Sequence, residues 1–291
     1  MHDARNGPAY DLPPSQEAPR SYVIASLPRS GSTLLARALW ESGVAGAPGE
    51  YFNPRHMDDF LERWGGFHAF GIARLLTSGP SVWKRTTTLR SMPLRDYVGA
   101  LRRSRSTPNG VFGVKLHYGH LERSFLGAGY DVEDVLGRPR WIWMVRRDHV
   151  RQAVSYVRAL QTKAWRSDSK VNEAPHYDFE RIARRLADFE TREEAWERWL
   201  ASRGIEPLRI VYEAFAESYE PTVRAVLRHV GIPEADRVRI PPPPLERQAD
   251  ERTEQWVERF LQDAARHGRM PAHNESARLQ PGPSPRYMPG T

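Results

Sequence analysis

The chain has 291 residues, of which 40% are hydrophobic and 27% charged, proportions that are ordinary for a folded enzyme. It contains no cysteine, which excludes disulfides, cysteine nucleophiles and cysteine-ligated metal sites. The formal net charge is +7, but the arginines are spread along the chain, so we expect no nucleic-acid partner.

The chain begins with a polar, proline-rich stretch, residues 1–20, which predicts a disordered arm. This stretch lacks the apolar core of a signal peptide, so we expect a cytoplasmic protein. No segment approaches the roughly 20 apolar residues of a membrane-spanning helix. The last residues, 271–291, predict a disordered tail, which leaves one folded domain over residues 21–270.

Short apolar runs and amphipathic stretches alternate within this domain. The apolar runs predict buried strands in residues 22–26, 111–115, 140–145 and 207–212. The amphipathic stretches predict helices in residues 33–42, 150–162, 178–203, 221–230 and 253–268. Strands of this type, separated by helices, indicate an α/β fold with helices on both faces of a mainly parallel sheet.

The turn between the first strand and the first helix has the composition of an anion site. Gly31 allows a tight turn, and the N–H groups at the helix start would point at a bound anion. Arg29 adds a positive charge, and Ser30, Ser32 and Thr33 add hydroxyl donors. The alternative is an ordinary strand–helix turn. The loop lacks the lysine and second glycine of a Walker A motif, which removes the main support for a kinase-like enzyme.

A second anion site is predicted where the third strand passes into a helix. Arg147 and Ser155 are eight residues apart, so two helical turns place both on one face, where one phosphate can contact them. Alone, the pair is better explained as a surface arginine and an unrelated serine. Together, two such sites suit a nucleotide with phosphate groups at both ends.

At this point the sequence resembles the sulfotransferases that use 3′-phosphoadenosine-5′-phosphosulfate (PAPS), and most closely the Stf0 sulfotransferases. The resemblance covers residues 22–268. The matching blocks, in order, are residues 25–35, 43–46 with 48 and 50–52, 107–116, 152–156, 158–162, 165–166, 245–250 and 254–259. Arg29 stands where many PAPS-dependent relatives carry a lysine.

The resemblance implies a P-loop-like three-layer α/β/α fold and transfer of a sulfuryl group from PAPS to a hydroxyl. It implies no metal, and it suggests a homodimer. We expect the acceptor to be a carbohydrate or a glycosylated small molecule. Trehalose is one option that the resemblance does not single out.

The same resemblance makes Glu50 the general base, in a loop after the first helix. His117 is the competing candidate, because Lys115 and His117 have the Lys-x-His spacing of cytosolic sulfotransferases, in which the histidine is the base. We rank Glu50 first and keep His117 as a substrate contact or alternative base. We expect Lys115 to contact the transferred group or the bridging oxygen.

The remaining roles also follow from the resemblance. Arg29 would stabilise the leaving group, and Arg147 with Ser155 would hold the 3′-phosphate. Arg247 and Gln248 are assigned to the 3′-phosphate or the adenine end. Aromatic side chains on which a sugar ring could pack are expected at Tyr51, Phe52 and Trp165, with Trp83 a weaker candidate.

Two other functions are considered. A kinase-like transferase would need a Walker lysine and Mg²⁺ ligands, and neither occurs where it is required. A non-catalytic protein that only binds PAPS or its product would not need Glu50, Arg29 and Lys115. The sequence therefore favours a PAPS-dependent O-sulfotransferase.

Overall fold

The computed structural model describes residues 4–15, 20–64, 66–67, 90–91, 93–163, 174–233, 235–243 and 251–269. The chain divides into two compact units. The sheet unit comprises Met1–Val145 and Thr191–Glu246, and the helical unit comprises Arg146–Glu190 and Arg247–Thr291. Among the described helices, none combines the length and apolar character that crossing a membrane requires.

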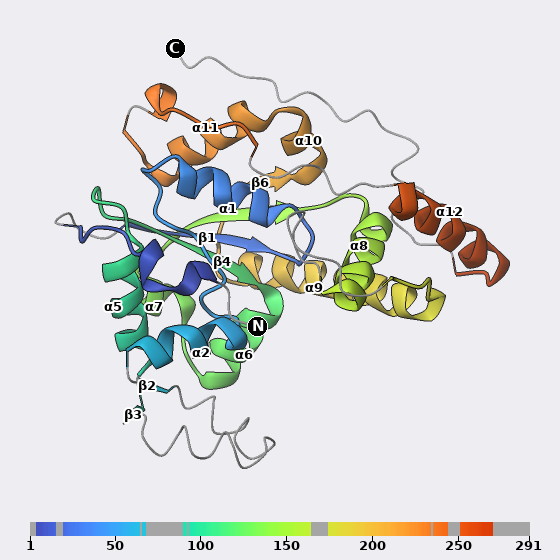
Figure 1. Ribbon diagram of the computed structural model, residues 1–291, viewed down its shortest axis with the longest axis horizontal. Helices are drawn as coiled ribbons and strands as arrows, with labels where there is room; N and C mark the ends of the chain where they lie inside the picture. Colours follow the sequence, from blue (N-terminus) through green and yellow to red (C-terminus); the bar gives the residue numbers. More distant parts are fainter. Residues whose placement is uncertain are drawn as a thin grey trace. The chain divides into compact units, whose positions relative to one another are not determined.

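The sheet unit is built on four parallel strands in the order β4-β1-β5-β6 (Figure 1). They are β1 (Arg20–Ser26), β4 (Val111–His117), β5 (Arg140–Val145) and β6 (Leu208–Val211). All four predicted strands are confirmed. Ser26 lies opposite His117 in the β1–β4 register, so the two strands end level with each other. Whatever follows β1 therefore begins beside the side chains at the end of β4.

Three helices cover one face of this sheet, namely α1 (Ser32–Glu41), α10 (Tyr212–Glu217) and α11 (Tyr219–Val230) (Figure 1). Their apolar side chains pack with alternate strand residues in one cluster; its fully buried members include Ile24, Leu39, Ile142 and Leu227. This burial of strand and helix surface is the main stabilising contribution on that side. Gly231 ends α11 with a positive φ of 84°, as a helix C-terminus favours.

The opposite face carries α5 (Leu94–Arg105), α6 (Tyr118–Ser124), α7 (Val132–Leu136) and the last turns of α9 (Phe179–Ser202). Trp196 of α9 is fully buried, contacts Trp141 edge-on at 6.3 Å and donates from Nε1 to the Ser26 carbonyl (3.2 Å). Helices thus cover both faces, and the predicted three-layer α/β/α architecture is confirmed. Helices α5, α6, α7 and α10 were not predicted from the sequence.

Smaller elements complete the unit. They are the helix α2 (Pro54–Arg63), the short parallel pair β2 (Gly66–Phe67) and β3 (Arg90–Ser91), and the 3-10 turns η3 (Leu126–Ala128) and η4 (Ala235–Arg237).

Residues 4–15 depart from the disordered arm predicted for residues 1–20. They form the 3-10 turns η1 (Ala4–Asn6) and η2 (Pro8–Tyr10). Arg105, almost fully buried, donates to the carbonyls of Tyr10 (2.8 Å) and Gly7 (3.2 Å) and pairs with Asp11 (3.2 Å). A polar segment can be ordered in this way because a buried arginine satisfies its backbone acceptors. Composition alone does not reveal such a partner.

The helical unit contains α8 (His149–Thr162), α12 (Glu251–Arg266) and the first turns of α9. Arg151 of α8 contacts Glu254 of α12 through Nε at 3.1 Å, and Arg158 donates to the Thr253 hydroxyl. Phe179 of α9 stacks on Phe260 of α12 at 5.2 Å. The helices predicted for residues 150–162, 178–203 and 253–268 are confirmed within one residue or two at each end.

Candidate active site

The loop between β1 and α1 is shaped by Gly31. Its φ is +85°, and an added Cβ would lie 2.3 Å from Cδ2 of Tyr212, so only glycine fits this position. Gly31 is also the N-cap residue of α1, and no side chain caps the helix there. The first turn of a helix presents N–H groups and the positive end of its dipole, which together favour a bound anion.

Two further features of this loop fit an anion. Arg29 has a φ of 64°, a conformation that costs energy in a non-glycine residue and is typical of tight functional turns. Ser30 is 1% exposed, and its Oγ has no hydrogen-bond partner within the described part of the chain. A buried hydroxyl without a partner is unfavourable by about 1–3 kcal/mol, so we expect a ligand or a water to complete the hydrogen bonding of Ser30.

The loop that carries Glu50 is fixed to the end of β4. Gly49 forms an isolated parallel bridge with Val114, and the Lys115 N–H donates to the Gly49 carbonyl (2.9 Å). On the other side of Glu50, the Tyr97 hydroxyl donates to the Tyr51 carbonyl (2.7 Å). These backbone bonds hold the Glu50 side chain, which is 19% exposed, beside the side chains of β4.

Lys115 connects Glu50 to the loop between β1 and α1 and to the first turn of α1, residues 27–33, a segment named the anion loop below for the ligand that the sequence predicts there. Its Nζ lies 2.8 Å from Glu50 Oε1 and donates to Thr33 Oγ1 at 2.9 Å. The lysine side chain is 8% exposed, so solvent weakens this ion pair much less than it weakens a surface pair. One ammonium group therefore contacts both the predicted base and the first turn of α1.

His117 lies on the other side of the same carboxylate. Its Nε2 is 3.3 Å from Glu50 Oε1, and its Nδ1 is 3.0 Å from Ser26 Oγ. A carboxylate only accepts hydrogen bonds, so Nε2 carries the proton that faces Glu50. Both ring nitrogens of His117 are thus engaged within the protein.

The second oxygen of Glu50 is less occupied. Asn53 Nδ2 donates to Oε2 at 2.9 Å, and this is the contact that the described residues make with that oxygen. A carboxylate oxygen can accept two hydrogen bonds, so Oε2 keeps a lone pair for a ligand. Asn53 was not singled out by the sequence analysis; only its place three residues after Glu50, in a turn, could have indicated it.

The charges around Glu50 control its protonation. Burial alone would raise the pKa of Glu50, but the ammonium group of Lys115 and the contact with His117 outweigh it. The pKa of this carboxyl therefore lies well below its usual range. Glu50 is ionised at neutral pH, as a proton acceptor must be.

His120 is a further residue beside this group that the sequence analysis missed. It belongs to α6, and its ring centre lies 5.2 Å from that of His117. Burial, and after it His117, lowers the pKa of His120 to about 3. The ring is therefore neutral at physiological pH.

Comparisons with known proteins agree on one family. The model of the family described as Stf0 sulphotransferase matches residues 21–263. The chain is 34% identical over 268 residues to trehalose 2-sulfotransferase of Mycolicibacterium smegmatis, covering 86% of this chain and 97% of that protein. The protein of the same name from Mycobacterium tuberculosis is also 34% identical, covering 86% and 98%.

This chain belongs to the Stf0 sulphotransferase family. The resemblance inferred from the sequence is confirmed, and the chain is a sulfotransferase. Among solved structures, the sulfotransferase domain of the Synechococcus PCC 7002 olefin synthase aligns with a TM-score of 0.45 and 16% identity, over 85% of this chain and 96% of that one.

Two aromatic residues proposed for the acceptor are used in packing by this Stf0 protein. Tyr51, 4% exposed, stacks on Phe112 at 5.9 Å and donates its hydroxyl to the Ala47 carbonyl. Phe52, fully buried, contacts Phe125 at 4.6 Å. Their contact with an acceptor stays a prediction. Trp165 and Trp83 lie outside the described residues.

The residues assigned to the 3′-phosphate belong to the helical unit. Arg147 is exposed and directly precedes Asp148, the N-cap of α8, whose side chain accepts from the Arg151 N–H at 2.8 Å. Ser155 is half-buried within α8. Arg247 and Gln248 lie outside the described residues, so their assignment stays a prediction.

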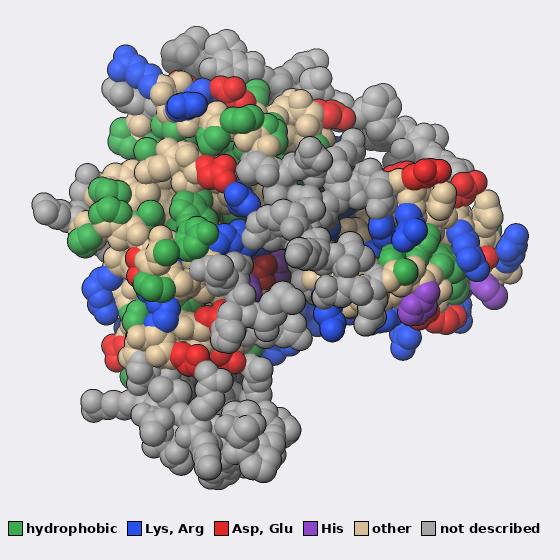
Figure 2. Space-filling view, viewed as in Figure 1, with side chains coloured by type: hydrophobic (Ala, Val, Ile, Leu, Met, Phe, Trp, Pro, Cys, Tyr) green, Lys and Arg blue, Asp and Glu red, His purple; other side chains and the backbone are tan. Residues whose placement is uncertain are grey.

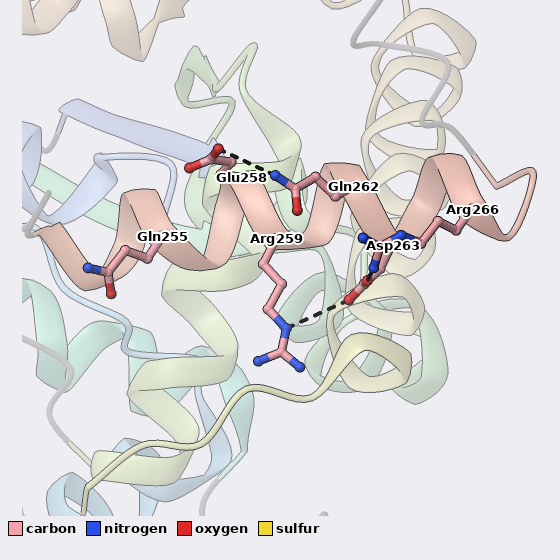
Figure 3. A pocket seen from close by; sticks show the side chains of 6 residues that line it. All are labelled: Gln255, Glu258, Arg259, Gln262, Asp263 and Arg266. Atoms are coloured by element: carbon pink, nitrogen blue, oxygen red, sulfur yellow. Dashed lines mark hydrogen bonds and ion pairs between the residues drawn. The ribbon is translucent and has the colours of Figure 1, made fainter.

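Among the described residues, the surface offers few other candidate sites. Figure 2 shows Lys and Arg side chains dispersed over the visible face, with acidic side chains between them. A hollow of about 360 Å³ is lined by six residues of α12: Gln255, Glu258, Arg259, Gln262, Asp263 and Arg266 (Figure 3). All six come from one helix, and several bond to one another, so nothing converges on a ligand there. Within the described ranges, no group of three or more metal-ligating side chains occurs.

Proposed function

We propose that this sulfotransferase moves a sulfuryl group from PAPS to a hydroxyl of a carbohydrate or glycosylated small molecule, by in-line transfer with Glu50 as general base. One observation carries the proposal. Lys115 contacts Glu50 (2.8 Å) and Thr33 of the anion loop (2.9 Å) at once. The group that accepts a proton and the loop suited to the donor are therefore one side chain apart.

The donor site fits a phosphosulfate. The unpartnered Ser30 hydroxyl and the uncapped start of α1 are donors without a described acceptor, and an anionic group is the ligand that satisfies both. Ser32 and Thr33 extend this set of donors, and Arg29 would stabilise the phosphate that leaves. By resemblance to the family, Arg147, Ser155, Arg247 and Gln248 hold the 3′-phosphate and the adenine end.

Glu50 is a better base than His117. His117 Nε2 points its proton at Glu50, and Nδ1 is taken by Ser26, so neither nitrogen is available to a substrate hydroxyl. Glu50 Oε2 keeps a lone pair. We therefore assign proton transfer to Oε2, and we assign to His117 the task of orienting the carboxylate.

Sulfuryl transfer requires a donor, an acceptor and the side chains of Glu50, Lys115 and Arg29. Bound PAPS supplies the sulfuryl group on a good leaving group, 3′-phosphoadenosine-5′-phosphate (PAP). The acceptor hydroxyl donates its proton to Glu50 Oε2 while its oxygen forms the new bond to sulfur and the bond from sulfur to the phosphate oxygen breaks. Lys115 stabilises negative charge on the transferred sulfuryl group or on the oxygen that bridges sulfur and phosphorus. Arg29 stabilises the phosphate that leaves. The products are a sulfate ester and PAP.

The acceptor class rests on the relatives. Both curated relatives are named for trehalose, so we propose a sugar hydroxyl and place trehalose first among candidates. We also propose a cytoplasmic homodimer that acts without a metal.

The test is mass spectrometry of PAPS turnover with trehalose, glucose and glycosylated metabolites. The expected result is a mass increase of one sulfuryl group on one acceptor, with PAP formed in equal amount. PAP binding without turnover of any acceptor would contradict the proposal in favour of a protein that only binds the nucleotide. Turnover that requires added metal ions would contradict the metal-free mechanism.

A further inference from the structure

The starting point is a buried ring nitrogen in the active site. His120 is 6% exposed, and its Nδ1 is a fully buried polar atom with no hydrogen-bond partner among the described residues. Such an atom is energetically unfavourable, so it is rare unless a ligand or a water satisfies it.

His120 and Glu50 are influenced by the same neighbouring side chains. After burial, the groups that act on the charge of His120 are His117, Glu50, Arg123 and Lys115, in that order. His117 stands between the two, in contact with the His120 ring (5.2 Å between centres) and with Glu50 Oε1 (3.3 Å). His120 is therefore about one imidazole ring away from the proposed base.

The backbone that carries His120 is fixed relative to the Glu50 loop. Ser124, in the same helix, donates from Oγ to the Phe52 carbonyl (2.9 Å), and Phe125, just after the helix, packs on Phe52 at 4.6 Å. The torsion that turns a histidine ring has a broad energy minimum, so a change in the direction of Nδ1 costs little torsional energy.

The chemistry of the ring defines the ligand. Four ionisable groups act electrostatically on its charge, the acid Glu50 and the bases His117, Arg123 and Lys115, and burial keeps the ring neutral. A neutral imidazole offers one donor and one acceptor, which matches a hydroxyl and gives no preference for a charged group.

We propose that His120 Nδ1 exchanges a hydrogen bond with an acceptor hydroxyl adjacent to the one that is sulfated. The inference rests on the proposed function and adds the class of acceptor to it: a polyol with hydroxyls on neighbouring carbons, one at Glu50 Oε2 and the next at His120. His120 is in this account a substrate-binding residue that aligns the reacting hydroxyl.

Three variants separate this role from a structural one. H120N keeps a polar group near the place of Nδ1, H120Q places it near Nε2, and H120F keeps only a ring. Trehalose binding is measured by calorimetry in the presence of PAP, and PAP binding is measured separately. We expect H120F to weaken trehalose binding about tenfold, the effect of one net hydrogen bond. H120N should recover most of that loss, H120Q should not, and PAP affinity should stay within about twofold throughout.

Trehalose analogues that each lack one hydroxyl locate the partner. One of them should bind wild type about tenfold more weakly than trehalose does, yet bind H120F as well as trehalose does, which identifies the coupled pair. Equal losses in H120N and H120F, or a loss of PAP affinity in either, would overturn the inference and indicate a structural role. Trehalose binding unchanged in H120F would overturn it while leaving the proposed function intact. If wild type binds no trehalose with PAP present, the acceptor found by PAPS turnover replaces trehalose in the same measurements; turnover of no carbohydrate or glycosylated acceptor would contradict the proposed function, and the inference with it.

Discussion

Lys115 Nζ lies 2.8 Å from Glu50 Oε1, and both side chains are largely buried at the carboxyl end of β4. The ion pair keeps Glu50 ionised, and it also makes the carboxylate a weaker base than it would be alone. Contact between Lys115 and a bound donor would draw charge away from Glu50 and strengthen the base when it is needed.

Replacing Lys115 with methionine should raise the pKa of Glu50, because burial then acts without the opposing ammonium charge. The acid limb of the pH profile of kcat/KM should move to higher pH, and kcat should fall by about 10²-fold or more, the size expected for one charge-stabilising group. Lys163→Met, at an exposed lysine, is the control and should leave both unchanged. An acid limb that stays at the same pH would contradict the effect of Lys115 on the pKa of Glu50.

The free energy of unfolding should depend on pH because of the ion pair between Lys115 and Glu50. The pKa of Glu50 is depressed in the folded state, so its contribution to stability is fully present above the ordinary carboxyl pKa and is lost as pH falls toward the folded value. We expect wild type to exceed Glu50→Gln in urea stability at pH 6 by more than it does at pH 3. A difference that grows on acidification would contradict the lowered pKa.

The central sheet is the part of the fold that the sequence predicted best, because the signal for each strand lies within a short segment. Runs such as Trp141–Val145 are buried on both faces of a parallel sheet, so they are apolar throughout and are easy to recognise. The position of Lys115 beside Thr33 agrees with the general rule that ligand sites form at the carboxyl ends of parallel strands.

What the sequence could not predict depends on long-range contacts. Asn53 and His120 are ordinary polar residues until the Glu50 loop bridges to β4 and Ser124 anchors α6 to Phe52. Arg105 is likewise one of three arginines in the last turn of α5, and nothing in the sequence distinguishes it as the buried one. The family resemblance supplied Glu50, since a loop glutamate has no distinguishing pattern of its own.

Gly31→Ala should destabilise the protein and weaken PAP binding together. An alanine here is strained by the positive φ of 85°, and its Cβ meets the Tyr212 ring at 2.3 Å. Gly43 has a similar φ of 73° with nothing within 4 Å, so Gly43→Ala isolates the cost of φ, about 1–2 kcal/mol. Denaturant unfolding should show a larger loss for Gly31→Ala, and only this variant should lose PAP affinity. Equal effects would indicate that the contact with Tyr212 is unimportant.

Arg105→Met should release residues 4–15. The substitution removes the donors to the Gly7 and Tyr10 carbonyls and the pair with Asp11, at a cost of about 1–3 kcal/mol. Limited proteolysis should then cleave the N-terminal segment faster than in wild type. Arg103→Met, at an exposed position of the same helix, should not change the cleavage rate. Identical rates in both variants would contradict the anchoring role.

The most direct test of the central claim is the rate of sulfated product formation, measured by mass spectrometry, in Glu50→Gln and His117→Ala with PAPS and the acceptor found in the panel. If Glu50 is the base, Glu50→Gln should lose about 10²–10⁴-fold in kcat while PAP affinity persists, and His117→Ala should lose clearly less. Activity that survives Glu50→Gln and disappears in His117→Ala would contradict the account and transfer the base role to His117.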